Sequence, residues 1–173
     1  MTTSQPQSSS APHRAKHPRT VLAGPYGHPF HPILVTIPIG AWVASLVFDI
    51  AALSGGQPQV FSQGATWLIA IGIVGAVVAA LFGALDLSVI PRGTRAFTTA
   101  LVHMTINLVV LALYAISFVV RRGHGYVEVS GTGLVLSVAA LLLLGISGWL
   151  GGRLAYHYGV RVADEDTQAE GFR

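Results

Sequence analysis

Four long apolar segments separated by short polar connections dominate the pattern of this chain. They cover about residues 32–53, 65–86, 97–120 and 131–152. Each is close to the roughly 20 residues that an α-helix needs to cross a hydrocarbon core of about 30 Å. The pattern therefore predicts four transmembrane helices. Because the connections are short, successive helices are expected to be antiparallel, which gives an up-down-up-down four-helix bundle.

The residues outside these segments are predicted to form two tails. Residues 1–26 are rich in Ser, Gln, Thr and Pro and contain too few apolar residues to pack, so a disordered tail is expected. His13 and His17 have a spacing that matters only on a formed helix, and a solvated tail is the favoured interpretation. Residues 27–160 form the predicted transmembrane domain, and residues 161–173 form a second solvated tail.

Composition places the chain in the all-α integral membrane class. Hydrophobic residues make up 52% of the chain and charged residues only 10%, whereas a soluble domain carries roughly 25% charged residues. The net charge of +3 does not indicate a nucleic-acid partner, because the basic residues lie in loops and tails beside apolar runs. The partner that the composition implies is the lipid bilayer.

The distribution of lysine and arginine predicts the orientation. Eight of these residues lie in the two tails and the second loop, two lie in the third loop, and the first loop has none. Cytoplasmic loops carry the excess of such residues, so both termini are expected in the cytoplasm. Arginine outnumbers lysine nine to one, which is typical of GC-rich bacterial genomes. A multi-pass protein of the bacterial cytoplasmic (inner) membrane is predicted.

The residue inventory narrows the chemistry. The chain has no cysteine, which excludes disulfides, thiol catalysis, Fe–S ligation and the attachment of c-type haem. Ordinary hydrolase and P-loop motifs are also missing from the sequence, so an enzyme acting on its own is not expected. A b-type haem, or a metal held by His and carboxylate, remains compatible with the sequence.

Polar and small residues share one face of each predicted helix when the segments are projected at 100° per residue. Two stripes carry polar groups: His31, Val35, Pro38, Trp42, Ser45 and Asp49 on the first helix, and Thr99, His103, Asn107, Val110, Tyr114 and Ser117 on the third. Two carry mainly small residues: Gly72, Gly75, Ala79, Gly83 and Asp86 on the second helix, and Ser137, Gly145, Gly148 and Gly152 on the fourth. Polar groups facing lipid are costly, so all four stripes are predicted to face the interior.

Several strings along the chain resemble the bacterial family of predicted membrane proteins known as domain of unknown function 2231. The strings are His31-Pro32-Ile33-Leu34-Val35, Pro38-Ile39-Gly40, Phe48-Asp49, Asp86, Ile90-Pro91-Arg92-Gly93-Thr94-Arg95, His103 with Asn107, Gly148-Trp149-Leu150-Gly151-Gly152 and His157-Tyr158-Gly159-Val160. The resemblance spans about residues 27–162. It implies a four-helix membrane protein, and because some members are fused to Rieske-type or cytochrome c domains, it also implies a redox protein partner.

Three ionisable residues on different helices are predicted to lie at the same depth in the membrane. His31 begins the first helix, Asp86 ends the second, and His103 lies about 9 Å into the third, all on the predicted cytoplasmic side. Two histidines from different helices at one depth are what bis-imidazole ligation of b-type haem requires. His31 and His103 are therefore predicted to bind haem or, as the alternative, a bare metal ion.

Further residues complete this predicted cofactor site. Asp86 or Asn107 could accept a hydrogen bond and so orient a ligand imidazole. Arg92 and Arg95, with Arg153, lie just outside the level of the histidines, where haem propionates would need cations.

Two other interpretations stay open. In a structural or partner-binding scaffold, the same polar groups only bridge helices, and Asp86 forms an ion pair with Arg92 or Arg95. In a proton or small-ion relay, Asp49 and Tyr114 would continue the polar file toward the outer surface, although Val110 interrupts it. The substrate, the partner and the oligomeric state do not follow from the sequence.

Overall fold

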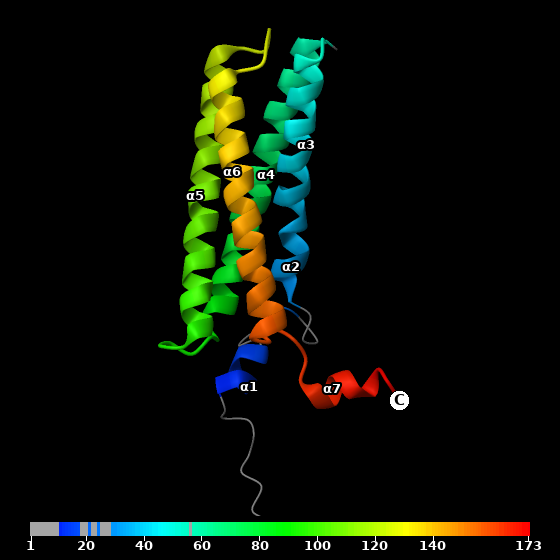
Figure 1. Cartoon of the computed structure of the whole chain (residues 1–173), viewed down its shortest axis with the longest axis vertical. Coiled ribbons are helices and arrows are strands. Elements are labelled where there is room, and N and C mark those ends of the chain that lie inside the picture. The colour runs from blue at the N-terminus through cyan, green and yellow to red at the C-terminus, as the bar shows by residue number, and fades with distance from the viewer. Residues whose placement is uncertain (1–10, 18–20, 22–23, 25–28, 56) are drawn as a thin grey trace, which may run out of the picture.

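The computed structural model describes residues 11–17, 21, 24, 29–55 and 57–173, and it folds into an up-down-up-down bundle (Figure 1). Over the described residues the chain is helical and contains no strand, which confirms the predicted fold class. The elements of the bundle are α2 (Phe30–Leu34), α3 (Thr36–Leu53), α4 (Pro58–Leu87), α5 (Arg95–His124) and α6 (Gly131–Gly152), which the π-helical turn η4 (Arg153–His157) extends. Four of the described helical segments are long and apolar enough to cross a membrane.

The helices extend further than the apolar pattern predicted. Helices α4 and α5 each contain 30 residues, about 45 Å at 1.5 Å per residue, and so exceed a hydrocarbon core of about 30 Å. Their starts follow from local capping. Pro58 occupies the first turn of α4, where a missing N–H is harmless, and the Thr94 hydroxyl accepts a hydrogen bond from the Phe97 N–H at the start of α5.

The first transmembrane helix is divided at Val35 into α2 and α3. Pro38 explains the division, because proline has no N–H to donate to the carbonyl of Leu34 and its ring clashes with that carbonyl. His31 therefore lies on the short segment α2, which leads into the main helix α3.

Both described tails lie at one end of the bundle, here called the termini end (Figure 1). The α4–α5 loop lies there too, and the α3–α4 and α5–α6 loops lie at the opposite end, here called the loop end. Within the tail predicted to be disordered, α1 (Ala11–Lys16) forms a short helix at the termini end; residues 1–10 lie outside the described part. Helix α7 (Glu165–Glu170) extends sideways from the bundle.

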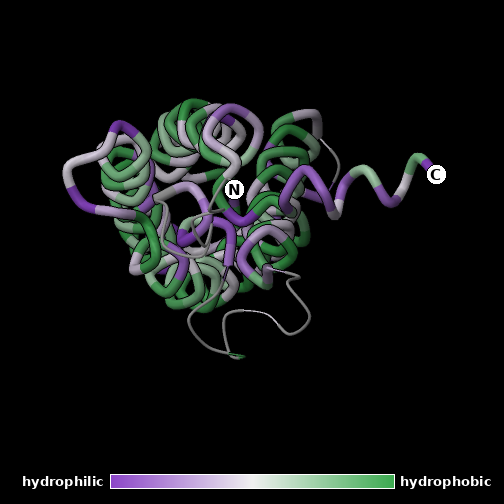
Figure 2. The backbone as a smooth tube through the Cα atoms, turned by 90° about the horizontal axis from the view of Figure 1, so that it is seen from below, coloured by the Kyte–Doolittle hydropathy of each residue, from purple (hydrophilic) through white to green (hydrophobic). Residues whose placement is uncertain are grey.

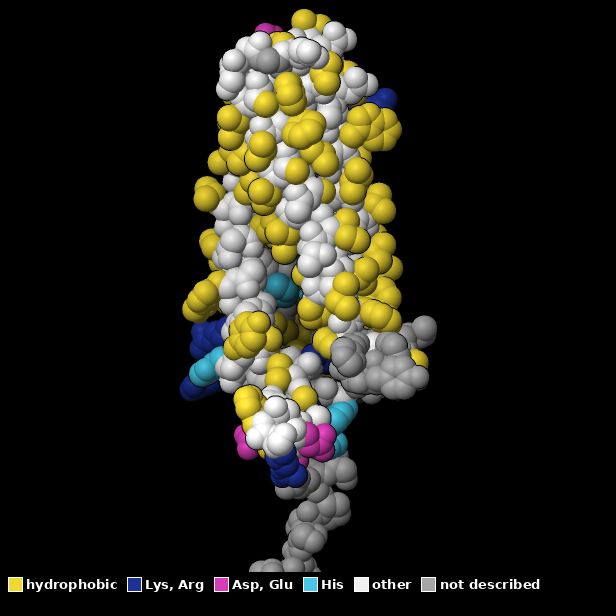
Figure 3. Space-filling model, turned by 90° about the vertical axis from the view of Figure 1, so that its right-hand side faces the viewer, with side chains coloured by type: hydrophobic (Ala, Val, Ile, Leu, Met, Phe, Trp, Pro, Cys, Tyr) yellow, Lys and Arg dark blue, Asp and Glu magenta, His cyan; other side chains and the backbone are white. Residues whose placement is uncertain are grey.

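The bundle is apolar on the outside and partly polar inside, as a lipid solvent requires. Seen end-on, the four helices surround a common centre (Figure 2), and hydrophobic side chains cover most of the bundle's length on the face in Figure 3. Large side chains such as Trp67 and Leu142 are 66% and 69% exposed, whereas Asp49 and Ser137 are fully buried. Soluble proteins bury large apolar side chains and expose charged ones. The reverse arrangement in this bundle indicates contact with lipid.

The predicted interior faces are largely correct, with one exception. Pro38, Trp42, Ser45 and Asp49 of α3 are buried, as are Gly72, Gly75 and Ala79 of α4 and Val110, Tyr114 and Ser117 of α5. On α6 the prediction for Gly145 and Gly148 was wrong, because both are exposed. The inward face of α6 instead carries Gly133, Ser137, Ala140 and Ser147.

The bundle consists of two hairpins built on the same pattern. The first comprises α2, α3 and α4, and the second comprises α5 and α6. Four residues of the first helix each have a counterpart on α5 that lies 72 positions later in the sequence. The pairs are His31 and His103, Trp42 and Tyr114, Ser45 and Ser117, and Asp49 and Arg121.

Hydrogen bonds within each hairpin repeat as well. The imidazoles of His31 and His103 contact the carbonyls of Ala79 and Ser147, and the Trp42 indole and Tyr114 hydroxyl donate to the carbonyls of Ile69 and Ser137, both at 3.4 Å. Because both hairpins begin at the termini end, they are parallel repeats about an axis along the bundle, as seen in several membrane folds.

Candidate functional site

Three layers of paired side chains meet where the two hairpins face each other. The layer nearest the termini end pairs His31 with His103. The middle layer pairs Trp42 with Tyr114, and the layer nearest the loop end pairs Asp49 with Arg121. Each pair takes one residue from the first helix of each hairpin, so each layer is complete only when both hairpins are present.

The two histidines of the first layer come close together in the half of the bundle near the tails. Their ring centroids are 6.4 Å apart and the ring planes are nearly perpendicular, at 89°. Both side chains are half-buried. Figure 3 shows a histidine side chain in a hollow between helices in this half of the bundle. The predicted convergence of the two residues is therefore seen in the structure.

Backbone carbonyls determine which nitrogen of each imidazole carries the proton. Nδ1 of His31 lies 2.9 Å from the carbonyl oxygen of Ala79, and Nδ1 of His103 lies 2.8 Å from that of Ser147. Since a carbonyl can only accept, both Nδ1 atoms must donate a proton. In the neutral form, an imidazole with a proton on Nδ1 presents a lone pair on Nε2, the atom that metals bind when Nδ1 is held in this way.

Two glycines let the imidazoles approach the neighbouring helices. A Cβ atom on Gly83 would lie 3.1 Å from Cε1 of His31, and one on Gly151 would lie 3.2 Å from Cε1 of His103. Gly83 follows the acceptor Ala79 by one turn, and Gly151 follows the acceptor Ser147 by one turn. The small residues therefore make room for the imidazole rings themselves.

Asn107 and Asp86, the predicted accessory residues, have different partners. The Asn107 side-chain amide donates to Nε2 of His103 over 3.1 Å and to the backbone carbonyl of His103 over 2.9 Å. Asp86 forms an ion pair with Arg161, with Oδ1 and Nε 2.9 Å apart. The prediction that Asp86 pairs with Arg92 or Arg95 was therefore wrong. The chain after η4 returns to α4 and places Arg161 beside Asp86.

The predicted arginines lie at the termini end outside this layer. Arg92, Arg95 and Arg153 are exposed. Arg92 lines a cavity of about 1040 Å³ between the α4–α5 loop and α1, whose other basic lining residues are His13, Arg14 and His17. Arg153 lies over the rings of Trp149 and Tyr158, at 5.8 and 5.6 Å from the ring centroids.

The middle layer is aromatic and apolar. The rings of Trp42 and Tyr114 stack with their centroids 4.1 Å apart and their planes 10° apart. Val110, Ile69 and Ala140 complete this buried cluster. Because Tyr114 packs on Trp42 and donates to a backbone carbonyl, this layer separates the histidines from Asp49.

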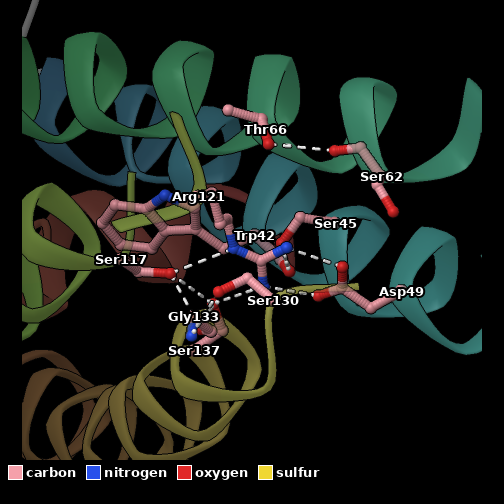
Figure 4. Close-up of polar contacts among 10 residues, drawn as sticks. All are labelled: Trp42, Ser45, Asp49, Ser62, Thr66, Ser117, Arg121, Ser130, Gly133 and Ser137. Atoms are coloured by element: carbon pink, nitrogen blue, oxygen red, sulfur yellow. Dashed lines mark hydrogen bonds and ion pairs between the residues drawn. The ribbon is translucent and has the colours of Figure 1, made fainter. Parts of the chain in front are cut away.

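The layer nearest the loop end is a buried ion pair (Figure 4). Nη1 and Nη2 of Arg121 each donate to one carboxylate oxygen of Asp49 over 2.7 Å, and both side chains are at most 3% exposed. The Nε–H donates to the Ser117 hydroxyl over 3.1 Å, and Nη2 also lies 3.3 Å from the Ser137 hydroxyl. These bonds satisfy the guanidinium within the bundle.

Arg121 and Arg161 are the residues that sequence reasoning missed. Arg121 was assigned to the third loop, yet it lies in the last turn of α5. The sequence did contain a signal for the position of Arg121. This residue follows Ser117 by four positions and therefore continues the polar stripe of α5. Arg161 was assigned to a solvated tail, but it is only 8% exposed. No local pattern in the sequence points to Arg161.

Comparison with known proteins supports the architecture. The sequence profile of a family described as "Predicted membrane protein (DUF2231)" matches residues 27–164. No curated protein and no solved structure is significantly similar to the chain. The match includes all four long helices and both histidines of the first layer, and it confirms the resemblance seen in the sequence. The chain therefore belongs to the family of predicted membrane proteins known as domain of unknown function 2231.

Proposed function

We propose that this protein binds one b-type haem between His31 and His103 and serves as a redox module of the bacterial cytoplasmic membrane. The observation that carries the proposal is the pair of imidazoles, one from each hairpin, with both Nδ1 atoms held by carbonyls. A ligand nitrogen lies about 2.0–2.1 Å from a metal, so two imidazole centroids on opposite sides of an iron lie about 6 Å apart. The centroid separation of 6.4 Å in the structure is close to that value.

The number of ligands favours haem over a bare metal ion. A structural zinc ion takes four protein ligands, and a catalytic one takes three. The first layer offers two imidazoles, with Asn107 beside them as an amide. Haem iron takes four nitrogens from its own macrocycle, so His31 and His103 would supply the two ligands that remain.

The charges at the termini end suit the acidic groups of haem. Arg92 and Arg95 are exposed on the α4–α5 loop and the start of α5, at the end of the bundle nearer the histidines. Haem propionates are anions and are stabilised by such cations. Asn107, which donates to Nε2 of His103, would release that lone pair to the iron.

Bound haem would supply one-electron transfer, and the chain's own residues would hold it in place and limit water access. The Trp42–Tyr114 layer closes the site toward the loop end. A redox protein partner at the termini end would exchange electrons with it. The excess of Lys and Arg in the tails and second loop supports a cytoplasmic position for that end.

An optical spectrum of the full chain in mild detergent tests this function. The wild type, supplied with haem during expression, is expected to show about one haem per chain and a Soret band that shifts on reduction with dithionite. His31→Ala and His103→Ala should each reduce haem content at least tenfold, because each removes one of the two histidines that would hold the haem. His124→Ala, a histidine at the loop end, is the matched control and should retain haem.

Two results would contradict the proposal. One is a folded wild-type protein that takes up no haem. The other is haem retained in the double variant His31→Ala/His103→Ala. Reduced expression of these variants without any spectral band in the wild type would instead support the scaffold interpretation.

A further inference from the structure

The two tails contact each other at the termini end. The Arg161 N–H donates to the carbonyl of Ala15 in α1 over 3.0 Å. Ala15 and Val160 are buried together in a cluster that also includes Ile90 of the α4–α5 loop and Ala100 of α5. Arg161 has a φ of +60°, which costs free energy for a non-glycine residue, and its ion pair with Asp86 offsets that cost. These contacts hold α1 against the chain that follows η4.

This arrangement brings together three side chains of types that commonly bind metal ions. His13 and His17 lie one helical turn apart, and their ring centroids are separated by 4.4 Å. Asp164 comes from the chain just before α7, and its Oδ2 lies 3.1 Å from Nε2 of His17. One ligand atom from each of the three residues lies within 4.8 Å of the others. Residues about 150 positions apart therefore converge at one point.

We infer that His13, His17 and Asp164 form a binding site for a divalent transition-metal ion of the Zn²⁺ class, which would join the two tails. Ligands around a tetrahedral ion at about 2.0–2.2 Å lie about 3.3 Å from one another. The widest separation in the present cluster, up to 4.8 Å, would therefore need to shorten by about 1.5 Å. His13 lies on the six-residue helix α1, and His17 directly follows the last residue of that helix.

The chemistry of the ligands selects the class of ion. Two imidazoles and one carboxylate suit Zn²⁺ and its neighbours, whereas Mg²⁺ and Ca²⁺ require oxygen ligands. The carboxylate is available in its ionised form. An aspartate carboxyl ordinarily loses its proton well below neutral pH.

Lys16 does not block the site, because it uses the other carboxylate oxygen. Its Nζ lies 3.4 Å from Oδ1 of Asp164, while Oδ2 faces His17. Three protein ligands leave a fourth position for water or an exchangeable group. His13 and His17 also line the cavity of about 1040 Å³ beside the α4–α5 loop, so solvent can reach the site.

This site is separate from the proposed haem site, because it uses neither His31 nor His103. It lies on α1 and the segment before α7, outside the four long helices. The family match begins at residue 27, so His13 and His17 lie outside it. The inference therefore does not rest on the family match, and it can be tested independently of the proposed function.

Zinc binding to the purified full chain, with any polyhistidine tag removed, tests the inference. Titration with Zn²⁺ followed by calorimetry is expected to show about one ion per chain. In His13→Ala/His17→Ala the affinity should fall at least tenfold, and in Asp164→Asn it should fall to a smaller extent, because the two imidazoles remain. Mg²⁺ should not compete with Zn²⁺ at this site. The matched control is His124→Ala/His157→Ala, which removes two exposed histidines elsewhere and should bind Zn²⁺ as the wild type does.

Two further measurements make the outcome decisive. Zn²⁺ should slow tryptic cleavage at Arg14 and Lys16 in the wild type but not in His13→Ala/His17→Ala. His31→Ala/His103→Ala should retain Zn²⁺ binding, which separates this site from the haem site. Equal Zn²⁺ affinity in the wild type and in folded His13→Ala/His17→Ala would overturn the inference, as would the absence of binding to the wild type.

Discussion

Asp49→Ala is expected to lower the free energy of unfolding by about 3–5 kcal/mol, since removing one partner of a buried ion pair leaves an uncompensated buried charge. The charge left behind is the guanidinium of Arg121, which is 2% exposed and donates to both carboxylate oxygens. The serines around it accept hydrogen bonds but cannot neutralise its charge. The measurement is thermal or SDS-induced unfolding of the full chain in mild detergent.

The neighbouring Arg122 provides the control for this prediction. It is exposed at the same end of α5, with its guanidinium 5.8 Å from the centroid of the Phe118 ring. Arg122→Ala should change stability by less than about 1 kcal/mol. The double variant Asp49→Leu/Arg121→Met should recover most of the lost stability, because no buried charge remains. Equal effects of Asp49→Ala and Arg122→Ala would show that the ion pair contributes nothing.

Gly72→Ala is expected to destabilise the bundle by about 1–3 kcal/mol, the usual effect of overpacking a closely packed core. A Cβ atom on Gly72 would overlap the indole of Trp42, which is 2% exposed and stacks on Tyr114. The indole cannot move away without disturbing that stack and its bond to the Ile69 carbonyl. Unfolding in detergent, with near-ultraviolet circular dichroism as a probe of the aromatic pair, measures the effect.

Gly145→Ala in α6 is the matched control. It too replaces a glycine within a transmembrane helix, but a Cβ atom there has no neighbour within 4 Å. Because alanine has a better helix propensity than glycine, stability should stay the same or rise by up to about 1 kcal/mol. The packing argument fails if both alanine variants behave alike.

The sequence was sufficient to predict the four helices, their order and the approach of His31 to His103. Length and hydropathy determine the helices, and a 100° projection determines which faces turn inward. The projection failed for Gly145 and Gly148 because a small residue is equally suited to a helix contact and to lipid. The histidine partners Ala79 and Ser147 show a further limit. Every residue has a backbone carbonyl, so the residue type does not reveal which carbonyl accepts a hydrogen bond from a histidine.

Long-range contacts outside the helical pattern could not be predicted. Arg161 reaches Asp86 through a turn that includes a residue with positive φ, and no periodicity signals that return. Arg121 was misplaced for a different reason: apolar-run analysis ends a helix at the first charge. A charge that is neutralised within the bundle does not end the helix, and α5 continues for three residues beyond it.

The difference in charge between the otherwise matching hairpins determines which hairpin can pair with which. If a second copy of the first hairpin replaced the second hairpin, two Asp49 carboxylates would meet in the buried layer. Two copies of the second hairpin would bring two Arg121 guanidiniums together. Either combination leaves like charges facing each other without compensation, and like-charge contacts cost several kcal/mol. The single opposite pair therefore favours contact between a first and a second hairpin and disfavours contact between two copies of the same hairpin in one membrane.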